Sequence, residues 1–210
     1  MIESVEQNLK NGKLLPLMEE FYTIQGEGFH TGKPAYFVRI GGCDVGCSWC
    51  DTKRSWNAEI HPAVLADEIV KRAVATPGKA VVVTGGEPSM YELSYFTAEL
   101  HKNQILTFIE TSGAHKLSGE WDWICLSPKR QIPPKKEIFK KAHELKMIVQ
   151  TEDDIAWAEE NSLKVSERCE LYLQPEWSVS SKILPIIIEY AKNNPKWKIS
   201  LQSHKYMKIP

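Results

Sequence analysis

The sequence predicts an α/β fold in the form of an incomplete, TIM-like β/α barrel. Short β-rich runs alternate with helical patterns along the 210 residues, which favours a largely parallel sheet. A complete barrel usually needs about 250 residues, so a partial barrel or an open curved sheet is expected. No repeat, linker or low-complexity stretch interrupts the sequence. We therefore expect a single domain over residues 1–210.

The predicted strands are short runs rich in β-branched, aromatic and other apolar residues. They lie at 18–23, 35–40, 80–84, 105–110, 123–126, 146–149, 170–173 and 197–201. Helices are predicted between several of these strands, at 65–74, 91–101, 153–160 and 182–192. In the first helix Leu65, Ile69 and Ala73 recur at every fourth residue, which is the spacing of one helix face.

Polar or reactive clusters come directly after several predicted strands. They are a group of cysteines and the segments 84–88, 110–113, 127–129 and 174–177. Active sites of parallel β/α folds gather at the carboxyl ends of the strands. We therefore expect these clusters to share one edge of the sheet and to form the site.

Composition and charge favour a cytoplasmic protein with a sizeable core. Hydrophobic residues make up 42% of the chain, and the net charge of −1 predicts no attraction to nucleic acid or to anionic membranes. The first residues lack the apolar core of a signal peptide, and no run of eighteen apolar residues occurs. Five cysteines, an odd number with three of them clustered, favour a reducing compartment and a metal site.

Three cysteines, Cys43, Cys47 and Cys50, form a C-x3-C-x2-C pattern after the second predicted strand. Structural zinc sites and the cubic clusters of ferredoxins both take four protein ligands. The other two cysteines, Cys125 and Cys169, are remote; Cys125 is expected to be buried, and Cys169 to be buried or a surface thiol. An iron–sulfur cluster held by three cysteines leaves one iron open to a small molecule. The alternative is a zinc site that takes His30 or Asp51 as its fourth ligand.

A Gly-Gly-Glu run, Gly85 to Glu87, follows the predicted strand at 80–84. Without a Cβ, the two glycines let backbone groups approach a ligand closely. The carboxylate beside them can pair with an ammonium group. Alone, this run is as consistent with an ordinary turn; together with the three cysteines it indicates an amino acid moiety at the open iron, the signature of radical S-adenosylmethionine (SAM) enzymes.

The segment 21–28, with Arg39, the cysteines and Thr52, closely resembles the 7-carboxy-7-deazaguanine synthase family of that superfamily. The likeness continues through 84–88, 110–113, 127–129, 174–175 and 200–205. It implies a carbon–nitrogen lyase of queuosine and deazapurine biosynthesis. A [4Fe–4S] cluster on the three cysteines would chelate SAM, and reduction would release a 5′-deoxyadenosyl radical. That radical would take a hydrogen from C6 of 6-carboxy-5,6,7,8-tetrahydropterin, after which the ring contracts, ammonia leaves and 7-carboxy-7-deazaguanine forms.

The resemblance also implies roles for individual positions. Cys43, Cys47, Cys50 and Thr52 would be the catalytic positions, with Thr52 as a ligand of Mg²⁺. Substrate-binding positions would be Ile24, Gln25, Gly26, Arg39, Thr84 and Pro210. Positions that hold the cofactor would be Trp49, Cys50, Asp51, Gly86, Glu87, Ser127, Pro128, Lys129, Gln174, Pro175, Glu176 and Trp177. From the residues alone, Arg39 is as readily a surface ion pair, Thr52 a cap or turn residue, and Trp49 a shield for the cluster.

The resemblance also implies protein partners, and two other classes of protein share part of the sequence pattern. The family implies an electron donor such as flavodoxin or ferredoxin, and a homodimer. A glycyl-radical activase shares the cysteines and the Gly-Gly-Glu run, and a non-catalytic zinc module shares the cysteines alone. We expect structural roles for the histidines outside the matching segments and a solvated helix face for the lysine clump; these residues are His61, His101, His115, His143, Lys135, Lys136, Lys140 and Lys141. His204 and Lys205 lie in a matching segment but receive no role.

Overall fold

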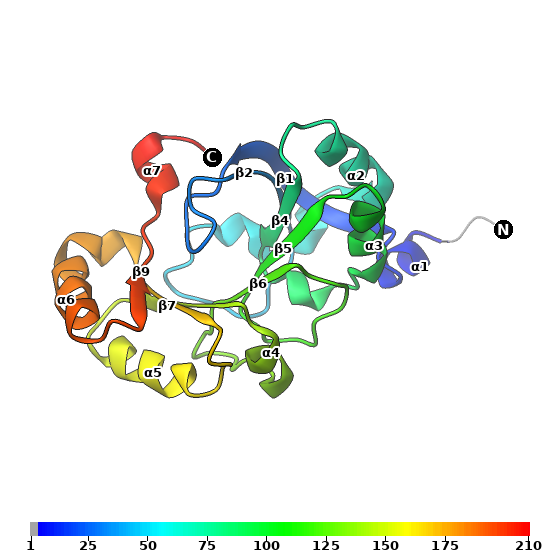
Figure 1. Ribbon diagram of the computed structural model, residues 1–210. Helices are drawn as coiled ribbons and strands as arrows, with labels where there is room; N and C mark the ends of the chain where they lie inside the picture. The colour runs from blue at the N-terminus through cyan, green and yellow to red at the C-terminus, as the bar shows by residue number, and fades with distance from the viewer. Residues whose placement is uncertain (1–3) are drawn as a thin grey trace.

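A computed structural model describes residues 4–210, so the single-domain prediction extends three residues beyond the described part. Within this range the chain forms a nine-stranded sheet in the order β3-β1-β2-β4-β5-β6-β7-β8-β9 (Figure 1). Every neighbouring pair from β2 to β9 is parallel, and β1 is antiparallel to both β2 and β3. The strands are β1 Leu14–Ile24, β2 Pro34–Ile40, β3 Ala63–Leu65, β4 Ala80–Gly85, β5 Leu106–Thr111, β6 Trp123–Leu126, β7 Glu144–Val149, β8 Glu170–Pro175 and β9 Trp197–Ile199.

Helices surround the outside of this sheet (Figure 1). Those named α2 to α6 connect successive strands, whereas the described chain passes from β5 to β6 through a loop without a helix. The α-helices are α1 Val5–Lys10, α2 Ala66–Val74, α3 Ser94–Lys102, α4 Lys136–Lys141, α5 Asp153–Ser162, α6 Ser180–Asn193 and α7 Ser203–Met207. Short 3-10 turns lie at Lys53–Trp56, Ala58–Ile60, Pro88–Met90 and Trp177–Val179. No helix in residues 4–210 is long and apolar enough to cross a membrane.

The strands turn alternate residues to the helices, because side chains along a strand point to opposite faces. In β7, Leu145 and Met147 are fully buried in the main hydrophobic core, which lies between the sheet and the helices. Glu144 and Lys146 of the same strand point to the inner face. The inner face therefore receives the polar residues from which a site can be built.

The loop 25–33, between β1 and β2, closes the side that the open sheet leaves uncovered. It reaches the segment after β9, where the backbone N–H of Gly28 donates to Ser200 Oγ at 2.9 Å and that of Ser203 donates to Gly26 O at 2.9 Å. The ring of Phe29 stacks on Trp123 with centroids 4.6 Å apart. Because β1 and β9 lie in opposite halves of the sheet order, this loop joins the two ends of an incomplete barrel.

The predicted fold class, an α/β fold with a mostly parallel sheet, is confirmed. The observed elements differ from the predicted ones at their ends, and several short elements were not predicted. Strand β1 begins at Leu14 because it also pairs with β3, a strand that was not predicted and that displaces the start of the next helix to Ala66. The short helices α1 and α7 were not predicted either, and α4 was expected only as the helix face of the lysine clump. In α4 the lysines are exposed while Ile138 and Phe139 are buried, so the lysine clump is the expected solvated helix face.

Candidate active site

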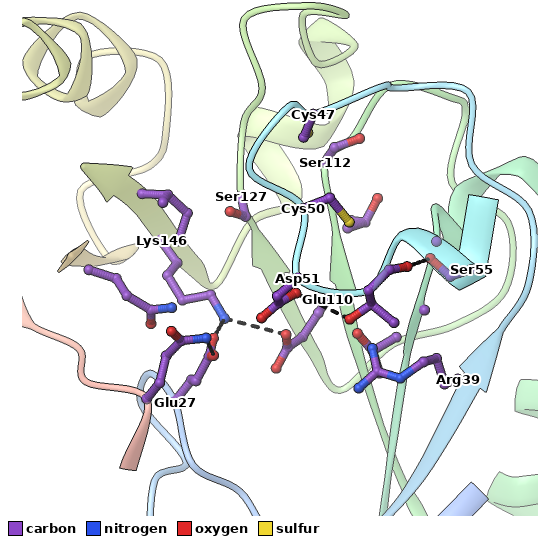
Figure 2. A pocket seen from close by; sticks show the side chains of 18 of the residues that line it. Glu27, Arg39, Cys47, Cys50, Asp51, Ser55, Glu110, Ser112, Ser127 and Lys146 are labelled. Atoms are coloured by element: carbon purple, nitrogen blue, oxygen red, sulfur yellow. Dashed lines mark hydrogen bonds and ion pairs between the residues drawn. The ribbon is translucent and has the colours of Figure 1, made fainter. Parts of the chain in front are cut away.

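The carboxyl ends of the parallel strands surround a cavity of about 270 Å³ (Figure 2). Every residue predicted for the site, except Pro128, lines this cavity. The lining includes the three cysteines and Thr52 from the loop after β2, Thr84 to Glu87 after β4, Ser127 and Lys129 after β6, Gln174 to Trp177 after β8, and Pro210. Pro128 is buried beside it. The expected convergence of the strand-end clusters is therefore found.

The cysteine loop packs as a small apolar unit at the cavity wall. Val45, Cys47 and Ala114 are buried together, with Cys43 and Cys50 packed against them. All three thiols are free of disulfide bonds. Burial raises the pKa of the Cys43 and Cys47 thiols above the ordinary value, so a metal centre has to drive their deprotonation. Three soft sulfur donors in an apolar wall suit an iron–sulfur cluster.

The arrangement gives no support to a single zinc ion. Within residues 4–210, no group of three or more His, Cys, Asp or Glu side chains is placed to hold one metal ion. His30 does not line the cavity; its ring stacks on Phe108 with centroids 4.3 Å apart. Asp51 lies in the cavity wall, where it accepts a hydrogen bond from Thr52 Oγ1 at 3.1 Å. In a cubic cluster each thiolate binds a different iron, so convergence on one point is not required.

The two glycines of the Gly-Gly-Glu run allow strand β4 to contact the cysteine loop. Gly85 has a φ of +140°, and a Cβ there would lie 2.1 Å from the carbonyl oxygen of Ile40. A Cβ on Gly86 would lie 2.1 Å from Gly42 O and 2.9 Å from Cys43 Cβ. Close approach of backbone was expected at these glycines, but the neighbour that requires it is the protein's own chain. The end of β4 thus holds the start of the cysteine loop in place.

The Glu87 carboxylate connects the ends of two strands. Its Oε1 accepts hydrogen bonds from Ser89 N at 2.9 Å, Ser89 Oγ at 2.6 Å and Thr111 Oγ1 at 2.5 Å. Its Oε2 accepts from Ser112 N at 2.7 Å and from Ser112 Oγ. A carboxylate offers about four acceptor positions, so these five contacts occupy its full acceptor capacity. The expected pairing of this carboxylate with an ammonium group gains no support from them.

Arg39 forms the surface ion pair that the residues alone suggested, and it also lies in the cavity lining. Its Nε donates to Glu19 Oε1 at 2.6 Å, which is the surface ion pair, and its side chain also lines the cavity. Thr52 is likewise both a turn residue and a cavity residue. Its carbonyl oxygen accepts from Ser55 N at 2.9 Å and from Ser55 Oγ at 2.7 Å, while its hydroxyl remains in the cavity wall.

Aromatic rings with lysines above them form further parts of the wall. Lys129 Nζ donates to Ser127 O at 2.6 Å and to Ser127 Oγ at 2.7 Å, and it lies 5.6 Å from the centre of the Trp49 ring. Lys205 Nζ lies 4.6 Å from the centre of the Trp177 ring. Such contacts hold flat apolar surfaces at the cavity. Lys205, which had no predicted role, thus anchors Trp177.

A buried charged network in the cavity was missed by the sequence analysis. Lys146 Nζ lies 2.5 Å from Glu27 Oε2 and 3.3 Å from Glu110 Oε2 (Figure 2). Gln25 Nε2 donates to Glu110 Oε1 at 2.9 Å, and Gln202 Nε2 donates to Glu27 Oε1 at 3.0 Å. Glu27 and Glu110 lie in segments that match the family, yet neither had been given a role. The alternation of Lys146 with apolar neighbours in its strand was the available signal.

His204, in helix α7, also lines the cavity and explains one of the predicted glycines. A Cβ on Gly26 would lie 2.4 Å from His204 Nδ1 and 2.7 Å from the His204 backbone nitrogen. Only glycine therefore lets α7 approach the loop 25–33 this closely. Of the remaining histidines, His101 contacts Asp122, and His115 contacts Asp44 next to the first cysteine. None of the four histidines expected to be structural lines the cavity.

Comparisons with known proteins agree with this arrangement. A family model described as the radical SAM superfamily matches residues 37–150. A 7-carboxy-7-deazaguanine synthase from Flavobacterium psychrophilum is 50% identical over 210 residues, which is 100% of both chains. The enzyme of that name from Synechocystis is 41% identical and covers 92% of this chain and 93% of its own. The one from Escherichia coli is 34% identical, with 92% and 98% covered.

The fold comparison gives the same result. The crystal structure of QueE from Escherichia coli superposes with a TM-score of 0.81 and 30% sequence identity. The match covers 97% of this chain and 100% of the other. The likeness therefore extends over the strands, the helices and the loops that build the cavity.

Proposed function

Because the chain belongs to the 7-carboxy-7-deazaguanine synthase family of the radical SAM superfamily, we propose that its cavity holds SAM and 6-carboxy-5,6,7,8-tetrahydropterin together. Family membership makes the chain a radical SAM enzyme of queuosine biosynthesis that uses a [4Fe–4S] cluster and acts on a pterin. One observation supports the proposal above the others. A single cavity is lined by the three thiols, by a free guanidinium edge and by buried carboxylates.

Cys43, Cys47 and Cys50 would hold the cluster. When bound, the cluster supplies the electron that cleaves SAM and generates the 5′-deoxyadenosyl radical. The apolar packing of Val45 and Ala114 around the thiols would keep water away from this centre. The contact of Gly86 with the backbone of the cysteine loop would fix the loop against the rest of the cavity.

The wall next to the thiols would bind SAM. Its polar members lie where donors and acceptors are already oriented: Lys129 is held by Ser127, and Gln174 Oε1 accepts from Ser200 Oγ at 2.6 Å. Its flat members, Trp49 and Trp177, offer ring faces on which an adenine can stack. The proposed set is Trp49, Cys50, Asp51, Gly86, Glu87, Ser127, Lys129, Gln174, Pro175, Glu176 and Trp177, with Pro128 supporting the wall from behind.

The pterin would lie between Arg39 and Glu27, which are on opposite sides of the view in Figure 2, with Glu110 drawn between them. A guanidinium has five N–H donors, and only Nε of Arg39 is engaged by Glu19, so its outer nitrogens can bind the substrate carboxylate. The opposite end of a pterin carries adjacent N–H groups that need acceptors, which Glu27 and Glu110 offer. Further proposed contacts come from Ile24, Gln25, Gly26, Thr84 and Pro210.

Thr52 would contribute a hydroxyl ligand to Mg²⁺. Magnesium binds few protein oxygens and keeps several waters, and it commonly bridges to an anionic group of the substrate. Thr52 and Arg39 line the same cavity, so we propose that a carboxylate held by Arg39 would also bind the metal. We also propose that flavodoxin or ferredoxin donates the electron, that the enzyme is a cytoplasmic homodimer and that residues 1–210 act as one domain.

Turnover by reconstituted enzyme tests the proposal. Under anaerobic conditions with reductant, SAM, Mg²⁺ and 6-carboxytetrahydropterin, we expect more than one 7-carboxy-7-deazaguanine per chain by mass spectrometry. Arg39→Ala should raise KM for the pterin by about 10- to 100-fold, because a charge-assisted pair is lost. Binding of SAM by this variant should be unchanged. Arg168→Ala, at an exposed arginine, is the control and should behave as wild type.

Two results would contradict the proposal in different ways. Slow formation of 5′-deoxyadenosine without deazaguanine would retain the radical chemistry and reject the pterin as substrate. Wild-type KM in Arg39→Ala would remove Arg39 from the substrate site.

A further inference from the structure

The charged network around Lys146 is not explained by stability. Two carboxylates, Glu27 and Glu110, meet one lysine, so the trio has a net charge of −1 in a largely buried position. Burying ionised groups is costly even when they are paired, and apolar residues in their place are often as stable or more so. The neighbours of Lys146 on the other face, Leu145 and Met147, show that β7 accommodates apolar side chains readily. The network is therefore expected to act in binding a ligand in the cavity.

All three residues line the cavity, and their side chains differ in exposure. The Lys146 side chain is 4% exposed, that of Glu27 14% and that of Glu110 24%. Lys146 and Gln25 each occupy one oxygen of Glu110, at 3.3 and 2.9 Å. Each of these oxygens retains a second acceptor position. Lys146 thus pairs with both carboxylates and is the least exposed of the three groups, and Glu110 is the most exposed.

Gln25 is itself held in one orientation. Its Oε1 accepts from the backbone N–H of Glu27 at 3.1 Å, so its Nε2 faces Glu110. Lys146 and Gln25 together offer only donors to the two carboxylates. Gln202 Nε2 also donates to Glu27 Oε1, so the acceptor positions left for a ligand that presents N–H groups lie mainly on Glu110.

We propose that Lys146 is a positioning residue for substrate recognition, which holds the carboxylates of Glu27 and Glu110 in place and directed at the N–H-rich edge of a 2-amino-4-oxopyrimidine ring. This inference rests on the proposed pterin substrate. Such an edge presents neighbouring ring and exocyclic N–H donors, which carboxylates bind as they bind the fork of a guanidinium. A net negative charge in the trio disfavours rings that present acceptors at this edge.

The test combines a variant of the lysine with a variant of the ligand. The holoenzyme is measured with 6-carboxytetrahydropterin and with the corresponding lumazine, in which an oxygen replaces the 2-amino group. Wild type should prefer the pterin by about tenfold or more in binding, as expected when a buried acceptor loses its donor. Lys146→Met should raise KM for the pterin by about tenfold, change kcat less and reduce the preference. Lys140→Met, on the exposed face of α4, is the matched control.

A second variant keeps the proposal testable if Lys146→Met does not fold. Lys146→Met combined with Glu27→Gln keeps the net charge of the trio at −1 but removes the support of Glu110. It should retain its cluster and its SAM binding and still lose the preference for the pterin. Lys146→Arg, which keeps the charge, should restore much of that preference.

The outcomes separate this inference from the proposed function. Unchanged KM and unchanged preference in the lysine variants would overturn the role of Lys146 and leave the pterin substrate in place. Equal binding of pterin and lumazine by wild type would overturn the recognition of the N–H edge, even if no lysine variant folds. A wild type that binds neither ligand would overturn the pterin substrate and this inference with it.

Discussion

At the scale of single residues, Glu27 illustrates how a buried carboxylate stays charged. Burial alone would raise its pKa, but the charge and hydrogen bond of Lys146, with a further bond from Gln202, lower the pKa from the ordinary 4.5 to about 2. The folded state therefore binds the proton of Glu27 more weakly than the unfolded chain does. The stability gained in this way is fully present above a pH of about 4.5 and is lost as the pH falls toward about 2.

The Glu27→Gln variant tests this dependence. It should unfold in less urea than wild type near neutral pH. The two urea midpoints should converge as the pH is lowered below about 4.5, because only wild type loses the stability that the charged Glu27 contributes. Tryptophan fluorescence of the full chain between pH 6 and pH 3 provides the measurement. Glu160→Gln, at an exposed position of α5, is the control and should follow wild type. A constant difference between Glu27→Gln and wild type at all pH values would contradict the assignment.

Part of this chemistry was predictable from single residues. The cysteines were identified from their type and spacing, whereas Thr52 and Arg39 were identified only through the resemblance to the family. Lys146 was not, although its alternation with Leu145 and Met147 placed it on a face that a parallel sheet usually buries. Its partners come from distant parts of the chain, 119 residues away for Glu27 and 36 for Glu110. Only the folded chain brings them together.

At the scale of elements, the ends of strands β2 and β4 depend on each other. The backbone N–H of Gly86 donates to Ile40 O at 2.9 Å, and that of Glu87 donates to Gly42 O at 2.8 Å. The first of the three cysteines follows directly after Gly42. The glycines of β4 are therefore expected to matter for the cysteine loop before any ligand is considered.

Gly86→Ala tests this dependence. Its new Cβ would meet Gly42 O and Cys43 Cβ, and relieving this contact should displace the cysteine loop. We expect the iron bound per chain after reconstitution to fall by about half or more, since overpacking a tight contact costs about 1–3 kcal/mol. Iron content and visible absorbance provide the measurement. Gly32→Ala, where φ is +89° but no atom lies within 4 Å, strains the backbone without a clash and should load normally. Full loading of Gly86→Ala would show that the loop does not depend on this contact.

The order of the elements was predictable where the hydrophobic pattern was long enough. The parallel strands and the helices α2, α3, α5 and α6 fall where expected, within a few residues at their ends. Strand β3 and helix α7 have three and five residues, too few for a periodic pattern. Helix α4 has six residues and only two buried side chains. Such pieces form because neighbouring elements offer partners, which a local pattern does not contain.

At the scale of the whole molecule, the cavity is completed by the loop between β1 and β2 and by the C-terminal segment. The loop 25–33 and the residues from Ser200 onward contact each other across the opening of the sheet. Residues from this closure, Gln25, Gly26, Glu27, Gln202, His204 and Pro210, line the cavity together with the strand ends. The recognition of substrate is thus proposed to depend on the closure, and the radical chemistry on the cysteine loop across from it.

The central claim is that one cavity holds both reactants in a defined orientation. The most direct measurement is an anaerobic crystal structure of the reconstituted enzyme with SAM and 6-carboxytetrahydropterin. We predict that SAM lies against the cysteine loop, with the pterin carboxylate toward Arg39 and Thr52 and its N–H edge toward Glu27 and Glu110. A pterin bound in the reverse orientation, or outside the cavity, would contradict the account.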